Sequence, residues 1–229
     1  MKLLALDTSS VACSVALQIG DDIVERHEEQ PREHTRLLMP MIQSLLADAG
    51  ASLPDLDAIV LGNGPGSFIG MRIAASVAQG LAFGASLQIV PVSSMAAVAA
   101  RVIVEHDAGE VIVAQDAHMQ EVYLGIYRRG DTDLPEETIP ECLHDLTKIV
   151  ELEPGSIAVA AGYGWQRYPE LLVANRDRVT VASDVLHPHA SDLLRFAPTM
   201  IENGDSVAPQ DIVPAYLRQK VAEKPTPIS

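Results

Sequence analysis

The chain has 229 residues, of which 48% are hydrophobic and 21% are charged, a balance that predicts a folded protein with a sizeable core, as one large domain or two small lobes. Its formal net charge of −15 at pH 7 would repel a phosphate backbone and argues against tight nucleic-acid binding through a basic surface. The only two cysteines, Cys13 and Cys142, do not indicate a disulfide framework, and no basic leader precedes the first apolar run, so we expect a cytoplasmic protein.

The first half of the chain predicts a meander of three strands followed by alternating helices and strands. An apolar run at 2–8 ends in Asp-Thr, 11–19 alternates between apolar and other side chains, and 22–28 follows a Gly-Asp-Asp turn, which is the pattern of short antiparallel strands. The further expected elements are a helix from Thr35 to Ala49, a strand at 57–62, a helix from Ser67 to Phe83, a strand at 87–92 and a helix from Ser93 to Val104.

The segment at 62–72 joins a strand to a helix through four closely spaced glycines. Glycine lets backbone N–H groups face an anion at a helix N-terminus. The segment lacks both the lysine of G-x-x-x-x-G-K-[ST] and the G-x-G-x-x-G order of dinucleotide sites. A tight strand-to-helix connection and a degenerate phosphate loop both fit this pattern. Because no G-x-S-x-G surrounds Ser67, we expect this residue to cap the helix rather than to act as a nucleophile.

No charged residue occurs from Ile73 to Ala100, so a membrane-spanning helix has to be considered. Gly80, Gly84 and Pro91 interrupt this apolar stretch and divide it into helix, strand and helix. We therefore expect no membrane span.

The second half of the chain repeats the order of the first. The expected elements are strands at 110–116 and 121–127, a helix at about 144–152, a strand at 157–161, a helix near 168–174, a strand near 178–182 and a helix from Ala190 to Ile201. Ala-Gln-Asp at 114–116 corresponds to Ala-Leu-Asp at 5–7, and Gly162-Tyr163-Gly164 corresponds to Gly62-Asn63-Gly64. The sequence thus predicts a duplicated unit, with one lobe at 1–105 and another at 106–229, a cleft between them, and a proline-rich C-terminal tail from Val207 whose end is frayed.

A duplicated lobe that begins with an Asp-Thr-Ser hairpin resembles the superfamily of actin, sugar kinases and the heat-shock chaperone ATPase. Three segments, at 7–10, 64–73 and 116–123, together resemble the TsaB (YeaZ) family. The similarity covers essentially the whole chain, although Ile69, Met71 and Ala74 stand where the family usually has Thr, Leu and Gly. The resemblance implies an α/β, duplicated two-lobe actin-like ATPase (ribonuclease H-like) fold.

The family resemblance also implies a function. Its members are non-catalytic subunits in the bacterial synthesis of threonylcarbamoyladenosine beside the tRNA anticodon. They bind the catalytic paralogue TsaD and, through it, the P-loop ATPase TsaE, and they contact tRNA only indirectly. The metal pair of the paralogue, His-x-x-x-His, corresponds here to Ser94 and Val98. The resemblance therefore implies no enzyme activity, no catalytic residue, no metal and no cofactor.

The nucleotide-binding loops of the superfamily are degenerate in this chain. The residues at the corresponding loop positions are Asp7, Thr8, Ser9, Gly64 and Gly66. Asp7 either caps its own Thr-Ser turn or retains a magnesium-orienting role. The second hairpin turn, at 116–120, contains no glycine and carries bulky side chains, so tight ATP binding is not expected.

Two helices carry more apolar residues than one buried face needs. The helix from Ser67 has few polar interruptions, and the helix from Thr35 has apolar residues outside its core-facing stripe. Both helices could lie in one large core, or their surplus could be a docking surface. The resemblance favours docking on TsaD as a helical bundle, or a homodimer in the isolated chain. The predicted partner-binding residues are Leu37, Met41, Met71, Arg72, Ala75 and Gln79.

A few remaining residues and two other functions stay open. His187-Pro188-His189 is either a metal pair or, more simply, a capping turn before a helix. We expect His118 to be a solvated loop residue, and Trp165 and Tyr163 to be packing residues. A small-molecule kinase would need a phosphate-binding second hairpin and a general base, and a metalloprotease would need a metal site.

Overall fold

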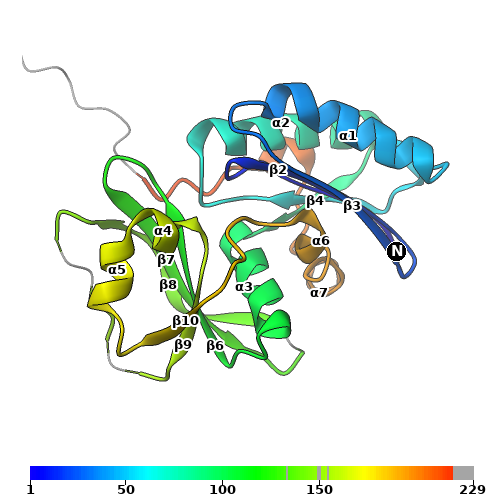
Figure 1. Cartoon of the computed structure of the whole chain (residues 1–229). Coiled ribbons are helices and arrows are strands. Elements are labelled where there is room, and N and C mark those ends of the chain that lie inside the picture. The colour runs from blue at the N-terminus through cyan, green and yellow to red at the C-terminus, as the bar shows by residue number, and fades with distance from the viewer. Residues whose placement is uncertain (133, 149–150, 154, 219–229) are drawn as a thin grey trace, which may run out of the picture.

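Two five-stranded sheets with the same strand order form the framework of the protein (Figure 1). The computed structural model describes residues 1–132, 134–148, 151–153 and 155–218. The first sheet has the order β3-β2-β1-β4-β5, with β1 (Lys2–Asp7), β2 (Ala12–Ile19), β3 (Asp22–Glu29), β4 (Ala58–Gly62) and β5 (Gln88–Val92). The second has the order β8-β7-β6-β9-β10, with β6 (Glu110–Asp116), β7 (Glu121–Arg129), β8 (Pro135–Asp145), β9 (Ala158–Ala161) and β10 (Val179–Ala182).

The pairing of the strands is also repeated between the two sheets. β1 pairs antiparallel with β2 and parallel with β4, just as β6 pairs with β7 and β9. Asp7 and Asp116, the last residues of the two copies of the Ala-x-Asp motif, therefore end corresponding strands. The predicted two-lobe α/β fold is confirmed.

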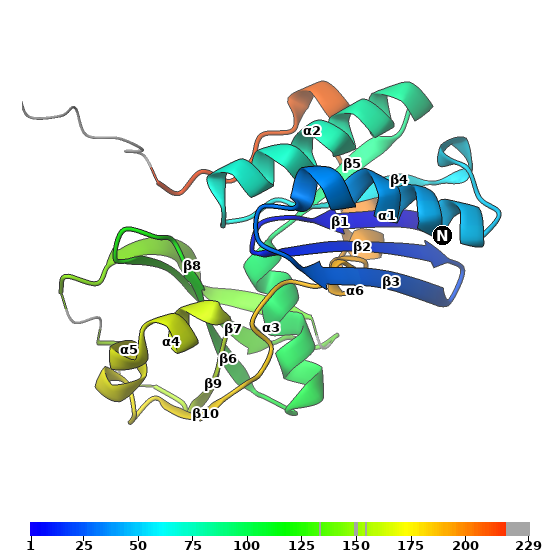
Figure 2. The same ribbon diagram turned by 45° about the horizontal axis from the view of Figure 1, so that its top comes forward.

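Helices cover both faces of the first sheet, and Figure 2 shows this layering. α1 (His34–Asp48) and α2 (Phe68–Ala85) pack on one face, against side chains such as Leu4 and Leu6. α6 (Ala190–Leu193) and α7 (Ala197–Asn203) pack on the other, against the alternate residues Leu3 and Ala5. Both faces of β1 are buried, which explains why its sequence is a continuous apolar run.

Each half of the chain contributes helices that pack on the sheet of the other half. α3 (Ser94–Glu105) belongs to the first half, yet Met95, Val98 and Val102 pack with the core of the second sheet. Conversely, α6 and α7 belong to the second half and pack on the first sheet. A boundary at residue 105 therefore separates the two sheets but not the two packed lobes. Sequence order could not reveal this, because each helix has an apolar face that either sheet could bury.

The second lobe departs from its prediction in three places. β8 extends to Asp145, and residues 146–148 and 151–153 form turn and coil, so the expected helix at 144–152 is wrong for these residues, while 149–150 lie outside the described residues. β8 is an edge strand whose described residues are all exposed or half-buried. Its sequence therefore lacks the alternation of apolar and polar residues by which a half-buried strand is predicted. The other differences are a split of the last helix into α6 and α7, with Pro198 in the first turn of α7, and two short helices, α4 (Tyr163–Arg167) and α5 (Pro169–Ala174).

The other expected elements agree with the structure to within about two residues, and short 3-10 turns occupy Leu53–Asp55 and Pro209–Asp211. Of the described helices, α2 is the one that is long and apolar enough, by length and composition, to fit a membrane span. Its Ala74, Ala78 and Ala82 pack on the first sheet.

The C-terminal segment at 207–218 is bound to both lobes. Val207 pairs with Ile89, the Ala215 N–H donates to the Asn63 carbonyl at 3.1 Å, and Leu217 packs on the core of the second sheet. The predicted frayed end falls on 219–229, outside the described residues.

Candidate functional site

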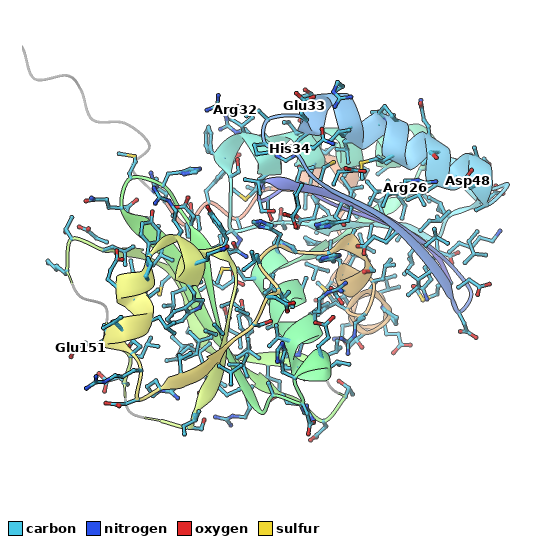
Figure 3. The ribbon with its side chains drawn as sticks, viewed as in Figure 1. Arg26, Arg32, Glu33, His34, Asp48 and Glu151 are labelled. Atoms are coloured by element: carbon cyan, nitrogen blue, oxygen red, sulfur yellow. The ribbon has the colours of Figure 1, made fainter. Side chains whose placement is uncertain are left out.

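A cavity of about 640 Å³ opens between the two lobes. Its walls come from the β1–β2 turn, the segment before α1, the start of α2, the end of β6, and two positions near the return to the first lobe. Figure 3 labels Arg32, Glu33 and His34 where the chain enters α1. The lining residues are Ser9, Ser10, Val11, Pro31, Arg32, His34, Thr35, Gly66, Ser67, Ile69, Gly70, Ile73, Gln115, Asp116, His118, Tyr163 and His187.

Asp7 lies behind this cavity rather than in its wall, and both of its carboxylate oxygens accept hydrogen bonds from the protein. Oδ1 accepts from the backbone N–H and the hydroxyl of Ser9, each at 2.7 Å, and Oδ2 accepts from the Ser94 hydroxyl at 2.6 Å. Burial raises the pKa of the Asp7 carboxyl, although the bonds from Ser94 and Ser9 oppose this effect. Asp7 therefore caps its own turn, which is the simpler of the two roles that its sequence allowed.

The glycines at 62–70 let the loop approach the β1–β2 turn closely. A Cβ on Gly62 would lie 1.9 Å from Asp7 Oδ2, one on Gly66 would lie 2.2 Å from the Ser9 carbonyl, and one on Gly70 would lie 1.9 Å from the Thr8 carbonyl. The Thr8 hydroxyl donates to the Gly70 carbonyl at 2.7 Å, and Ser67 Oγ accepts from the Gly70 N–H at 3.2 Å, as an N-cap does. Of the two roles left open for this loop, the structure supports the tight connection, with the glycines needed for packing.

The second hairpin turn has a backbone that glycine usually adopts. His118, Met119 and Gln120 have φ values of 60°, 56° and 59°, a left-handed conformation that costs non-glycine residues energy. Arg218 holds this turn, because its guanidinium donates to the Ala117 carbonyl at 2.6 Å and pairs with Glu121. That the side chains of this turn stand where the superfamily holds phosphates stays a prediction.

Three of the six predicted partner-binding residues are buried inside the first lobe. All three side chains are buried, and Met71 is only 3% exposed; Met41 and Ala75 belong to the core cluster on the first sheet. The expectation that these three side chains are surplus surface is therefore corrected. Periodicity did not identify them because α1 and α2 also contact each other, which widens the buried stripe of each helix beyond the face that meets the sheet.

The other three predicted residues reach the surface to different extents. Leu37 is half-buried against the core, and Gln79 donates to the Pro209 carbonyl at 3.0 Å. Arg72 is exposed, lies 3.8 Å above the Phe68 ring, and donates from Nε to the Tyr216 hydroxyl at 2.9 Å. Arg72 thus joins the start of α2 to the C-terminal segment.

α2 nevertheless presents an outward stripe that we call the α2 seam. It consists of Ile69, Ile73, Ser76, Gly80 and Phe83, which follow one another at intervals of four, three, four and three residues. Ile69 is 68% exposed and Phe83 is 78% exposed. A Cβ on Gly80 would meet no atom within 4 Å. This spacing is the one by which a helix packs along another helix, and the small central residues allow close approach.

The structure also brings together residues that the sequence did not connect. His189, from the His-Pro-His segment, lies with its Nδ1 3.0 Å from Glu25 Oε2, and its ring stacks on that of His27 at 3.9 Å. His189 occupies the N-cap position of α6, as the predicted capping turn places it, but its side chain makes no capping bond. Glu25 and His27 are two residues apart on β3, a spacing that places both side chains on one face of a strand. Nothing in the sequence located His189 beside them. Trp165 is a packing residue, as expected.

Comparisons with known proteins agree with this architecture. Residues 26–225 match the family model described as TsaD: tRNA N6-adenosine threonylcarbamoyltransferase. A protein of Escherichia coli called tRNA threonylcarbamoyladenosine biosynthesis protein TsaB is 40% identical, over 99% of both chains. The protein of the same name from Haemophilus influenzae is 36% identical, over 99% of this chain and 98% of its own length.

A solved structure gives the same result for the fold. The structure described as YeaZ from Pseudomonas aeruginosa superimposes with a TM-score of 0.86 at 38% sequence identity, covering 94% of this chain and 99% of that one. This likeness extends over both lobes.

Proposed function

The chain belongs to the TsaB family, and from this premise we propose that it is a non-catalytic subunit in the synthesis of threonylcarbamoyladenosine on tRNA. Its role is to bind a TsaD-like catalytic paralogue and to stabilise the productive conformation of that protein. It does so by binding the productive conformation of the paralogue more tightly than the unproductive one. A TsaE-like P-loop ATPase joins through the paralogue, tRNA is contacted indirectly, and the assembly works in the cytoplasm.

The observation that carries this proposal is the α2 seam. Ile69 and Phe83 are large apolar side chains that stay mostly exposed in the monomer, although Ile73 between them is half-buried, and exposed apolar surface is typical of interaction sites. The alternating spacing of four and three residues suits packing along a partner helix. In this proposal the buried Met41, Met71 and Ala75 support the interface from beneath, and Leu37, Arg72 and Gln79 lie at its border.

The interior of the cleft supports a non-catalytic role. Both carboxylate oxygens of Asp7 are already hydrogen-bonded to serines, so a magnesium ion would have to compete with these bonds. At the second turn there is no glycine, the backbone at 118–120 is left-handed, and His118 and Arg218 line a small pocket beside the glycine loop. These residues favour a binding subunit over a kinase.

The test is reconstitution of the modification from the purified paralogue, the ATPase subunit, tRNA and the remaining substrates, with and without this chain. We expect product only in the presence of the chain. Full-rate modification without the chain would remove the proposal.

A variant of the α2 seam distinguishes a loss of binding to the paralogue from a loss of folding. Gly80→Arg places a long cation on the seam at a position with free space, so we expect a folded monomer that binds the paralogue roughly 30-fold or more weakly, as for loss of a hot spot. Gly109→Arg is the matched control, because Gly109 is also exposed with open space around its Cβ. Light scattering of the isolated wild type tests the alternative that the seam pairs with a second copy.

A further inference from the structure

A cluster of two histidines and one glutamate lies outside the cleft, where the chain returns from the second lobe to the first. Glu25 and His27 are two residues apart on β3, and His189 immediately precedes α6. One donor atom from each of these side chains lies within 4.8 Å of the others. In sequence, 164 residues separate Glu25 from His189.

The surrounding contacts hold two of the three side chains in place. Glu25 Oε1 accepts from the Ser191 N–H at 3.0 Å and from the Ser14 hydroxyl at 3.0 Å. Although burial raises the pKa of Glu25, bonds from His189 and Ser191 lower it to about 2, so this carboxylate is ionised at neutral pH. Ser14 in turn accepts from the Ala190 N–H at 2.9 Å. The carboxylate and the start of α6 are thus fixed to each other.

The third side chain, His27, has buried ring nitrogens without a hydrogen-bond partner among the described residues. Its nearest charged contact is Glu29 Oε1, 3.6 Å from Nε2. Buried polar atoms usually have partners, so these nitrogens need an explanation.

We propose that Glu25, His27 and His189 bind a divalent transition-metal ion, of which Zn²⁺ is the best match. Two imidazoles and a carboxylate are a ligand set that Zn²⁺ accepts, with water in the fourth position. Ligand atoms on one tetrahedral Zn²⁺ lie roughly 3.3 Å apart, given bonds of about 2.0 Å. Because the rings of His27 and His189 are stacked 3.9 Å apart, His27 would have to turn out of this stack to bring its donor atom to that spacing, and its ring nitrogens have no hydrogen bond among the described residues that would oppose the turn.

The proposed ion has a structural role and is not a catalytic centre. None of the three ligands lines the cavity between the lobes, so the ion would not meet a substrate there. It would instead join β3, an edge strand of the first sheet, to the segment that returns from the second lobe. Figures 1 and 2 both show α6 beside β3. Binding of the ion to the folded chain alone would raise its stability by mass action.

The test uses the full chain without an affinity tag, stripped of metal and titrated with Zn²⁺ by calorimetry. We expect one ion per chain and a higher melting temperature in its presence. His27→Gln and His189→Gln should each weaken binding by about 100-fold or more, since changes that only surround a metal site already cost 10–100-fold. His118→Gln is the control, because His118 is an exposed loop histidine, and it should bind as the wild type does.

A second measurement needs only the wild-type chain. Zn²⁺ should protect His189, whose side chain is partly exposed, from diethylpyrocarbonate, as mapped by mass spectrometry, while His118 is modified equally with and without the ion. Saturable binding that survives both histidine substitutions would overturn the proposal, as would a wild type that binds no Zn²⁺ or gains no protection.

Discussion

Ser94 donates its hydroxyl hydrogen to Asp7 Oδ2 at 2.6 Å and accepts the Gly64 N–H at 3.0 Å. One hydroxyl group therefore connects the end of β1, the glycine loop and the start of α3, although 87 residues separate Ser94 from Asp7. By the family resemblance, Ser94 stands at a position where the catalytic paralogue has a metal-binding histidine. In this chain the Ser94 side chain instead holds two loops together.

Removal of this hydroxyl should weaken the first lobe. We expect Ser94→Ala to lower the free energy of unfolding by about 1–3 kcal/mol, because Asp7 Oδ2 and the Gly64 N–H are buried and would each lose a partner. Urea denaturation of the isolated chain measures the change. Ser76→Ala, an exposed position on α2, is the control and should change stability little; equal losses in both variants would contradict the role given to Ser94.

Asp7 should make stability decrease as pH rises. Burial raises the pKa of its carboxyl above the unfolded value of 3.8, so the folded state binds more protons between the two values, and stability falls as the pH increases through that window. Asp7→Asn keeps an acceptor for Ser9, and its amide can donate to Ser94, whose oxygen has two lone pairs. We expect denaturation curves from pH 4 upward to show a smaller decline for this variant than for the wild type. Parallel pH profiles would refute the assignment.

Glu25 should have the opposite effect. Its pKa is lowered from 4.5 to about 2, because bonds from His189 and Ser191 outweigh the effect of burial. The stability that it contributes is complete above the unfolded value and is lost as the pH falls from 4.5 toward 2. Glu25→Gln should therefore cost about 1.5–3 kcal/mol at pH 7, the range for hydrogen bonds to a charged group, and less at pH 3. A cost that does not change between these two pH values would argue against an ionised Glu25.

Two glycines of α2 should respond in opposite ways to a methyl group. A Cβ on Gly70 would collide with the Thr8 carbonyl, whereas one on Gly80 would meet open space. Gly70→Ala should destabilise the chain by about 1–3 kcal/mol through overpacking, and Gly80→Ala should stabilise it by up to about 1 kcal/mol through helix propensity. Thermal unfolding of the two monomers gives the comparison. Similar melting temperatures would show that the loop does not need its close approach.

Arg218 should keep the second hairpin turn in its left-handed conformation. We expect Arg218→Ala to accelerate amide hydrogen exchange at 117–121 and to lower stability by about 1–3 kcal/mol, because the buried Ala117 carbonyl loses a charged donor. Exchange in β1 and β2 serves as the internal reference. Unchanged exchange at the turn would mean that its backbone needs no support from the C-terminal segment.

The sequence by itself determined features that depend on neighbouring residues. The apolar runs and turns located the strands of the first half, the Gly-Pro-Gly-Ser segment located the N-cap of α2, and Asp7 and Asp116 marked the repeat. These predictions succeeded because strand alternation, helix capping and glycine conformation act over a few residues.

Only the tertiary structure decided which surfaces meet. It buried Met41 and Ala75 where α1 and α2 pack on the first sheet. It also packed α3 on the second sheet and α6 on the first, and placed His189 beside Glu25 and His27. An apolar stripe shows that a helix must be buried, but it does not specify the partner surface, because hydrophobic burial is non-directional. Contacts across 164 residues are set by the packing of the whole chain, so no local pattern in the sequence records them.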